Sequence, residues 1–193
     1  MNEDALKSLR EEALRTNIPI MQEETLDYIG SLITRHQYHT VLELGTAIGY
    51  SSLSLLHRVG QLSITTIERD EQRYLQAMEN FNVFRTRDSI ICHWMDVYDF
   101  ETTACFDVLI IDAAKAQNQP FYERFKDNVR SGGCIIIDNM NFHGLDSKQA
   151  KKDHRRNLSI MLDRIEKFDA YIESSDLAYN RYDIGDGLLV IWK

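Results

Sequence analysis

Hydrophobic residues recur along the chain with two periods, one helical and one extended. Residues 3–16 place their leucines and an alanine on one stripe between charged residues, which predicts an amphipathic helix. Pro19 ends this helix, because a proline disfavours helical backbone in the residue before it. The segment 23–36 repeats the helical spacing behind an acidic start and predicts a second helix.

After residue 40, short apolar runs alternate with helical patterns. The predicted strands are 40–44, 62–68, 89–95, 106–112 and 134–138, and the predicted helices are 51–59, 71–84 and 121–129. Ile135, Ile136 and Ile137 stand in a row, as in a strand that is buried on both faces. Short strands separated by helices predict an α/β fold with a parallel, doubly wound sheet.

The last part of the chain has a different pattern. Residues 148–168 form a charged helical stretch, and 170–174 and 188–192 read as two strands. The segment between them contains Gly185-Asp186-Gly187, a turn-forming sequence. A hairpin of this kind, placed beside the five parallel strands, predicts a seven-stranded mixed sheet with helices on both faces and an antiparallel last strand.

Length and composition predict one globular domain, 1–193. The chain has 193 residues, 44% of them hydrophobic, and no repeat or low-complexity tract. Three cysteines without C-x-x-C spacing favour a cytoplasmic protein with reduced thiols. No apolar stretch approaches the ~20 residues of a membrane span, and the charged start lacks the apolar region of a signal peptide. The net charge of −8 argues against a nucleic-acid partner unless basic residues gather locally.

The segment 41–51 carries the strongest chemical signal. A strand leads into Gly45 and Gly49, and a helix begins directly afterwards, an arrangement that holds nucleotide-like ligands. A dinucleotide site needs G-x-G-x-x-G, but Ala47 stands where the second glycine belongs. This spacing disfavours a nicotinamide oxidoreductase and favours an uncharged or cationic ligand such as S-adenosylmethionine. An ordinary strand-to-helix turn is the alternative.

Two acidic residues follow the next two strands. Glu68 lies 23 residues after Gly45, where an acid can accept hydrogen bonds from ribose hydroxyls. Its alternative role is a solvated helix cap. Asp96 follows the third strand, where a residue facing the adenine would lie, or it is a turn aspartate.

Two further strands end in oxygen-bearing side chains. Asp112 ends the fourth, and Asp138 and Asn139 end the fifth. Adjacent parallel strands lie about 4.8 Å apart, so these oxygens can converge on a hard divalent ion such as Mg2+. Strand-end caps are the alternative. Lys115 lies three residues past Asp112, and a dication beside it would lower the lysine pKa and favour a general base over a solvated side chain.

Taken together, the motifs V-L-E-L-G-x-x-x-G-Y-S, T-I-E-R, I-D-A-A-K, D-N-M and G-D-G-L resemble the bacterial branch of the cation-dependent, catechol-type O-methyltransferases, from about residue 18 to 192. This resemblance implies a Rossmann-like class I methyltransferase fold. Within the family the chain is most similar to tRNA 5-hydroxyuridine methyltransferases. The cofactor contacts so implied are Met21, Glu43, Gly45, Tyr50, Ser51, Glu68, Met95, Asp96 and Asp112. Metal ligation is implied for Asp112, Asp138 and Asn139, and the role of base for Lys115. Met95 departs from the pattern, because relatives often have a small residue there.

The expected acceptor is a hydroxyl beside a second oxygen, as in 5-hydroxyuridine of the tRNA wobble position or in a catechol-like phenol. Five basic residues against one acidic residue in 148–156 favour tRNA as a phosphate-binding patch, and the alternative is a solvated helix face. Arg85 and Arg87 could extend the patch, and Phe142 and His143 could line the substrate pocket. A non-catalytic nucleoside-binding protein on the same fold is the alternative hypothesis from a different functional class. The helices within 1–36 are expected to cap the cofactor or dimer side of a homodimer.

Overall fold

The computed structural model describes residues 3–113, 115–138, 140 and 156–193, with the side chain of Lys115 left out. The strands are β1 (Thr40–Leu44), β2 (Ser63–Glu68), β3 (Ile90–Trp94), β4 (Phe106–Ile111), β5 (Val129–Ile137), β6 (Tyr179–Tyr182) and β7 (Leu188–Trp192). The helices are α1 (Glu3–Arg15), α2 (Glu23–His36), α3 (Tyr50–Val59), α4 (Glu71–Val83), α5 (Asn118–Phe125) and α7 (Arg156–Glu173). Short 3-10 turns lie at η1 (Val97–Asp99), η2 (Lys115–Gln117) and η3 (Lys126–Asn128).

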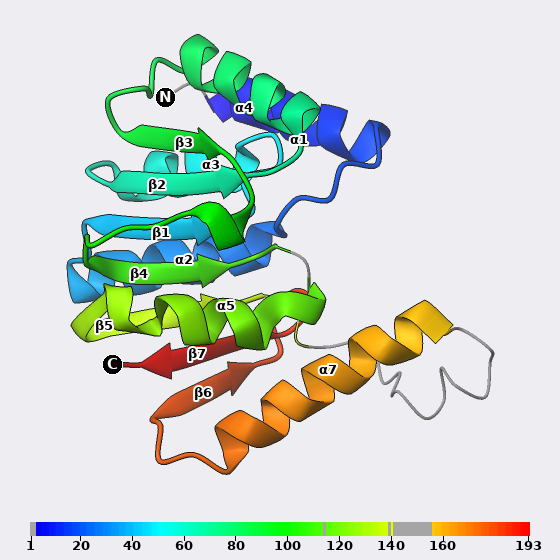
Figure 1. Cartoon of the computed structure of the whole chain (residues 1–193). Coiled ribbons are helices and arrows are strands. Elements are labelled where there is room, and N and C mark those ends of the chain that lie inside the picture. Colours follow the sequence, from blue (N-terminus) through cyan, green and yellow to red (C-terminus); the bar gives the residue numbers. More distant parts are fainter. Residues whose placement is uncertain (1–2, 114, 139, 141–155) are drawn as a thin grey trace.

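The strands form one seven-stranded sheet in the order β3-β2-β1-β4-β5-β7-β6 (Figure 1). Strands β1 to β5 pair in parallel, and β7 is antiparallel to both of its neighbours. This confirms the predicted mixed sheet and its antiparallel last strand. All five parallel strands therefore end at the same edge of the sheet, where residues that follow a strand are brought together.

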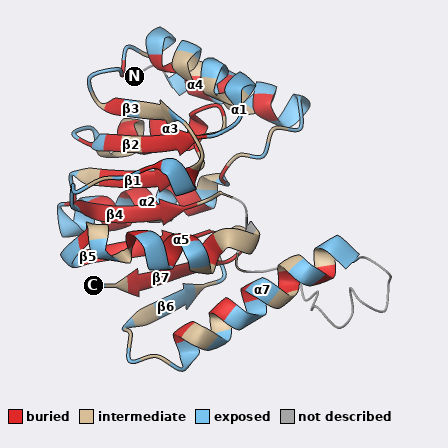
Figure 2. Cartoon of the chain, in the orientation of Figure 1, coloured by how far each residue is buried: buried red, intermediate tan, exposed pale blue. Residues whose placement is uncertain are grey.

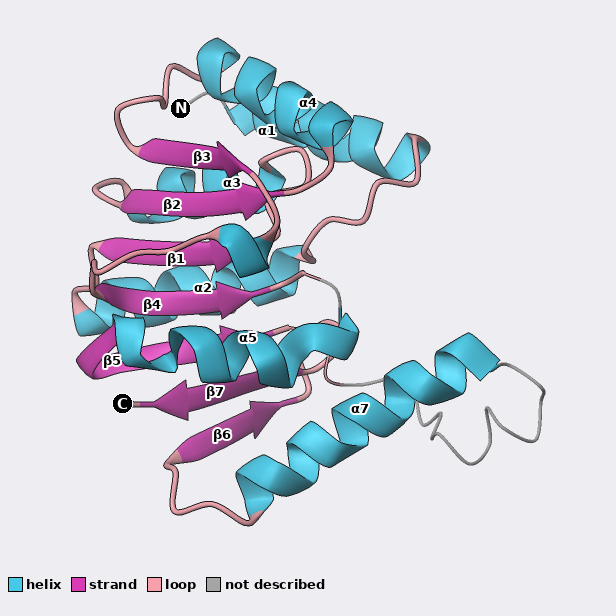
Figure 3. Ribbon diagram, in the orientation of Figure 1, coloured by secondary structure: helices cyan, strands magenta, loops and turns pink. Residues whose placement is uncertain are grey.

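Helices cover both faces of the sheet (Figure 3). On β4, Val108 and Ile110 point into one apolar layer with α1 to α4, and Leu109 and Ile111 point into the other with α5 and α7. All four side chains are fully buried, which explains why the strand reads as a continuous apolar run. Figure 2 shows this burial concentrated in the central strands.

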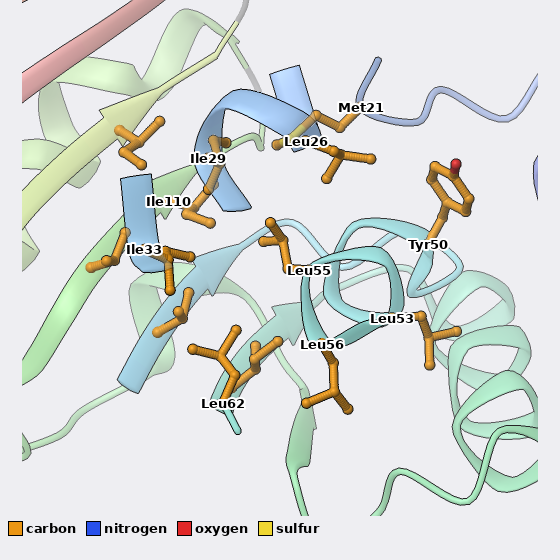
Figure 4. Packing of buried hydrophobic residues seen from close by; sticks show 14 of the residues in the cluster. Met21, Leu26, Ile29, Ile33, Tyr50, Leu53, Leu55, Leu56, Leu62 and Ile110 are labelled. Atoms are coloured by element: carbon orange, nitrogen blue, oxygen red, sulfur yellow. The ribbon is translucent and has the colours of Figure 1, made fainter. Parts of the chain in front are cut away.

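The first layer is built on α2 and α3. Figure 4 shows Leu26, Ile29 and Ile33 of α2 packed toward Leu55 of α3 and Ile110 of β4. These α2 positions are spaced by three and four residues, so they share one helix face. Their packing fixes the start of α2, and with it the segment before α2, against the edge where the parallel strands end.

One strand was predicted in the wrong place. Residues 170–173 do not form a strand but continue α7, whose buried residues include Ile165, Phe168 and Ile172 at helical spacing, and Ser174 is a turn residue. The sixth strand is Tyr179–Tyr182, an edge strand whose central residues are exposed. An edge strand with two polar central residues has no apolar alternation, so its sequence carried no strand signal.

Other boundaries also moved. The helix predicted at 121–129 begins three residues earlier and ends at Phe125, and β5 already begins at Val129. Of the helix predicted at 148–168, residues 148–155 lie outside the described part of the chain.

Candidate active site

A cavity of about 850 Å3 lies at the edge where the parallel strands end. Its walls come from the α1–α2 segment, from the loop after β1 and from residues that follow β2 to β5. Of the residues predicted from the sequence, those lining it are Met21, Gly45, Tyr50, Ser51, Glu68, Asp96, Asp112 and Asp138. The fold therefore gathers on one cavity side chains that lie up to 117 positions apart in the sequence.

The glycine loop forms part of the cavity wall. The N–H groups of Gly45 and Thr46 donate to the carbonyl of Ile67, at 3.1 and 3.2 Å, which ties the loop to the end of β2. Gly45 has a φ of +103°, and a Cβ built on it would lie 2.6 Å from the carbonyl oxygen of Asp112. No other residue type fits so close to the neighbouring backbone, so this glycine is required by the packing of two strand ends.

Glu43 lies beneath the loop and does not line the cavity. It is 1% exposed, and its carboxylate accepts hydrogen bonds from the hydroxyls of Ser51, Ser52 and Thr66, the last at 2.7 Å. Thr66 also shares a 2.6 Å hydrogen bond with the Thr46 hydroxyl. Glu43 thereby joins the loop, the start of α3 and β2 from below, while its direct contact with a cofactor stays a prediction.

Burial raises the pKa of Glu43, against the three hydroxyls that lower it, and the nearby Glu68 charge raises it further. The Glu43 carboxyl therefore stays protonated to a higher pH in the folded chain than in the unfolded chain. As a result, the free energy of unfolding falls as pH rises from about 4.5 toward the pKa of Glu43 in the folded chain. We expect Glu43→Gln to remove this loss of stability. The free energy of unfolding of the variant, relative to that of the wild type, therefore increases as pH rises. Urea titrations at several pH values between 5 and 8 measure the difference. Glu71→Gln, at an exposed acid of α4, is the control, and a pH-independent difference for Glu43→Gln would contradict the expectation.

Glu68 closes the other side of the loop. Its two carboxylate oxygens accept the N–H groups of Ala47 and Asp70, each at 2.8 Å, and the side chain is 8% exposed. A carboxylate offers about four acceptor positions, so each oxygen keeps capacity for a ribose hydroxyl. Its position between the glycine loop and α4 is compatible with the ribose role, which stays a prediction.

Asp96 is a turn residue that also faces the cavity. One oxygen accepts the N–H of Tyr98 at 3.0 Å and caps η1, and the other lies 3.7 Å from the guanidinium of Arg69. The structure thus shows the turn role, and the adenine contact stays a prediction. Met95 does not line the cavity but packs on the apolar layer around β4.

Asp112 and Asp138 lie side by side at the cavity. Ile111 of β4 pairs with Ile137 of β5, so the two aspartates follow their strands at the same level. Asp138 is 5% exposed and Asp112 is half-buried. Two carboxylates at neighbouring strand ends are a suitable donor set for a hard divalent cation. Among the described residues, no group of three or more His, Cys, Asp or Glu side chains gathers as a metal cluster; the expected set has two carboxylates and one amide, so this finding does not bear on it.

Several predicted residues lie outside the described part of the chain. Asn139, the third expected metal ligand, is one, as are Phe142, His143 and residues 148–155 of the basic run. The backbone of Lys115 begins η2, directly after the segment that follows β4, and its side chain is not described. Their predicted roles are therefore untested.

The cavity also has lining residues that the sequence patterns did not reveal, namely Arg10, Arg69, Arg73, Tyr98, Gln117 and Asp186. Tyr98 donates its hydroxyl to the side chain of Gln117 at 2.8 Å, which joins the ends of β3 and β4 across the cavity wall. Arg69 and Asp186 stand in the T-I-E-R and G-D-G-L motifs, but no role was predicted for either of them. The other four stand in no motif, and their sequence neighbours are ordinary turn and helix residues.

The N-terminal segment contributes one wall through Glu23, the first residue of α2. Its carboxylate accepts hydrogen bonds from Tyr50 and from Arg58, the latter at 2.6 Å, and lies 3.6 Å from the Arg10 guanidinium. Burial and this Glu23 bond raise the pKa of Tyr50 to about 12, so the phenol remains protonated and donates. The cluster holds α1 and α2 against α3 beside the cavity, whereas a dimer on this side stays a prediction.

The comparisons with known proteins agree with the fold. A structure from Staphylococcus aureus described provisionally as a caffeoyl-CoA O-methyltransferase superposes with a TM-score of 0.86 at 29% identity, over 97% of this chain and 92% of that one. A caffeoyl-CoA O-methyltransferase from Populus kitakamiensis is 26% identical over 96% of this chain and 84% of its own length. A tRNA1(Val) (adenine(37)-N6)-methyltransferase from Flavobacterium psychrophilum is 29% identical, but over 48% of this chain and only 38% of its own length.

The seven-stranded sheet with its glycine loop is the class I methyltransferase fold. The O-methyltransferase family model matches residues 1–193. The chain therefore belongs to the O-methyltransferase family, whose members are S-adenosylmethionine-dependent enzymes. Within the described residues, no helix is both long and apolar enough to cross a membrane.

Proposed function

We propose that this chain methylates a hydroxyl group with S-adenosylmethionine in a Mg2+-dependent reaction, and that its acceptor is 5-hydroxyuridine at the tRNA wobble position. The observation that carries the proposal is the pairing of Asp112 and Asp138 in the same cavity as the glycine loop and Glu68. A cofactor at the glycine loop and a cation at the two aspartates would share this one cavity, so the methyl donor and the acceptor hydroxyl could meet there.

The residues of this chain would have the following roles. Gly45, which lines the cavity, would let the cofactor approach the loop backbone, and Glu68 would orient its ribose. Asp112, Asp138 and Asn139 would hold the cation, which supplies Lewis acidity that lowers the pKa of an acceptor hydroxyl. S-adenosylmethionine supplies the methyl group on a cationic sulfonium. Lys115 Nζ would take the proton of that hydroxyl, and the wall formed by Met21 would exclude water.

The tRNA acceptor is the finer part of the proposal. It is supported by the local positive charge of residues 148–156 in a chain of net charge −8, and by the resemblance given above. The test is nucleoside analysis of tRNA from a strain that lacks this activity, before and after incubation with the protein, S-adenosylmethionine and Mg2+. We expect 5-methoxyuridine to appear at the expense of 5-hydroxyuridine.

A matched variant sharpens this test. Charge reversal at Lys151, Lys152, Arg155 and Arg156 is expected to raise the KM for tRNA while leaving the affinity for the cofactor unchanged. Unchanged methylation of tRNA by this variant would mean that the basic run does not take part in binding the acceptor.

A catechol-like phenol is the second candidate acceptor. It is favoured by the two relatives that are named as caffeoyl-CoA O-methyltransferases. A catechol offers two adjacent oxygens, as does the hydroxyl of 5-hydroxyuridine beside its carbonyl, so the site alone suits both. Turnover of simple catechols far above that of tRNA would favour this candidate. Cofactor binding without methylation of either acceptor would favour a non-catalytic nucleoside-binding protein.

A further inference from the structure

The turn between β6 and β7 brings one further carboxylate to the cavity. β7 runs antiparallel beside β5 with Leu189 opposite Ile137, so the residues before β7 lie alongside those that follow β5 (Figure 1). The N–H of Met140 donates to the carbonyl of Gly187 at 2.9 Å, which continues this pairing past the strand ends. Asp186 therefore stands beside the segment that follows β5, and it lines the same cavity.

The position of this turn is fixed by its packing against the start of α2. Gly185 has a φ of +56°, and a Cβ built on it would lie 2.5 Å from the hydroxyl oxygen of Thr25 and 3.5 Å from the amide carbon of Gln22. Such close packing leaves the turn little room to move toward α2. The half-buried side chain of Asp186 is thus held at the cavity by a well-packed backbone.

The charge of the cavity favours cations and hydrogen-bond donors over anions. Its described lining includes seven acids and three arginines, namely Glu23, Glu24, Glu68, Asp96, Asp112, Asp138 and Asp186 against Arg10, Arg69 and Arg73. The proposed cofactor and cation sites use acids that follow β2 to β5 and do not use Asp186. An aspartate before a glycine is also a common turn residue, so an experiment has to separate a binding role from turn stability.

The strand order places Asp186 on the side of the cavity that is remote from the cofactor. β1 and β2, which carry the glycine loop and Glu68, lie on one side of the pair Asp112 and Asp138, and β7 lies on the other. An acceptor that chelates a cation at these two aspartates has its reacting hydroxyl toward β1. Whatever part of the acceptor lies beyond its second oxygen then points toward the turn before β7.

A uracil ring places an N–H donor at that point. In 5-hydroxyuridine the reacting hydroxyl is on C5, the second chelating oxygen is the C4 carbonyl, and N3–H comes next around the ring. A carboxylate accepts such an N–H with a strong, charge-assisted hydrogen bond. A catechol has a C–H next to its second oxygen, so it gives the carboxylate no hydrogen bond to replace the water that it displaces.

We propose that Asp186 accepts a hydrogen bond from N3–H of the 5-hydroxyuridine base and thereby selects a uracil over a catechol-like phenol. The proposal rests on the proposed tRNA acceptor and names the residue that reads its base. Selection of this kind is effective because a site built to pair with a donor group rejects an analogue that lacks the donor.

Two synthetic anticodon stem-loop RNAs test the proposal, one with 5-hydroxyuridine at the wobble position and one with N3-methyl-5-hydroxyuridine. The N3-methyl group removes the donor and keeps both chelating oxygens. For the wild type we expect kcat/KM to be about 10- to 10²-fold lower for the N3-methyl RNA. Calorimetric titration in the presence of S-adenosylhomocysteine and Mg2+ should show a comparable loss of affinity, without any turnover.

Variants of the turn assign this selection to one side chain. Asp186→Ala is expected to lower kcat/KM for the 5-hydroxyuridine RNA and to abolish the difference between the two RNAs. Asp186→Asn keeps a carbonyl oxygen as acceptor and should retain most of the difference. Asp183→Ala, at an exposed aspartate of the same turn that does not line the cavity, is the control and should behave as the wild type. If Asp186→Ala weakens both RNAs by the same factor, Asp186 has a structural role only and the proposal is wrong.

The outcomes separate this inference from the proposed function. Equal methylation and equal affinity of the two RNAs with the wild type would overturn the role of Asp186 and keep the tRNA acceptor. Selective binding of the RNA with N3–H, without methyl transfer, would support Asp186 and contradict the tRNA methylation. Methylation of a catechol with neither RNA bound or methylated would overturn the tRNA acceptor and this inference together.

Discussion

Asp138→Asn is expected to lower kcat/KM for methyl transfer by about 10²- to 10³-fold, the usual effect of removing one preorganised electrostatic group from an active site. The substitution keeps the shape of the side chain and removes its charge. Asp138 is 5% exposed, and its N–H donates to the carbonyl of Ile111 at 3.3 Å. This backbone bond does not depend on the side chain, so the end of β5 should keep its position.

Initial rates across a range of Mg2+ concentrations check this expectation. If Asp138 holds the cation, the variant needs more Mg2+ for half-maximal rate, and its affinity for S-adenosylmethionine measured by calorimetry changes little. Asp99→Asn, at an exposed aspartate of η1, is the matched control and should behave as the wild type. Full activity of Asp138→Asn at the same Mg2+ concentration would exclude Asp138 from the cation site.

Gly45→Ala is the second substitution with a large expected effect. The alanine Cβ would lie 2.6 Å from the carbonyl oxygen of Asp112 and 3.0 Å from its carbonyl carbon, both backbone atoms of the next strand end. A φ of +103° adds backbone strain of about 1–3 kcal/mol for a residue with a Cβ. The loop and the end of β4 must move apart, and a displacement of about 1 Å at a reacting centre can cost about 10²-fold in rate.

We therefore expect Gly45→Ala to bind S-adenosylmethionine poorly, to lose about 10²-fold in kcat/KM and to unfold at a lower urea concentration. Calorimetric titration and urea unfolding measure the two effects. Gly60→Ala separates strain from clash, because Gly60 also has a positive φ, +88°, but a Cβ there would meet nothing within 4 Å. Equal behaviour of the two variants would mean that backbone strain alone, and not the contact with Asp112, makes Gly45 necessary.

The sequence predicted the core of the fold because its strands are buried on both faces. A continuous apolar run such as Ile135, Ile136 and Ile137 indicates a strand with two buried faces, and this run lies in β5. It failed at 170–174, where aromatic and β-branched residues in a helix were read as a strand. It also missed β6, since an edge strand can be polar and still pair through its backbone.

For the candidate site, the sequence identified residues that follow strands and could not identify how deep each one lies. Glu43 and Glu68 are both acids of the first two strands, yet Glu43 is sealed under the loop by three hydroxyls and Glu68 lines the cavity. Their depth depends on side-chain direction and on the neighbouring strand, which no local pattern encodes.

By itself, the sequence determined the order of strands and helices, the glycine loop and the acids at the strand ends, because each follows from local periodicity and chain connectivity. Tertiary structure alone decided that Arg10 reaches the same cavity as Asp138, and that Trp94 is exposed beside Arg69. The physical reason is that strand order and helix packing set distances between residues far apart in the chain. The glycine loop predicts a cofactor site from sequence, and the surface around the cavity opening becomes visible only once the chain is folded.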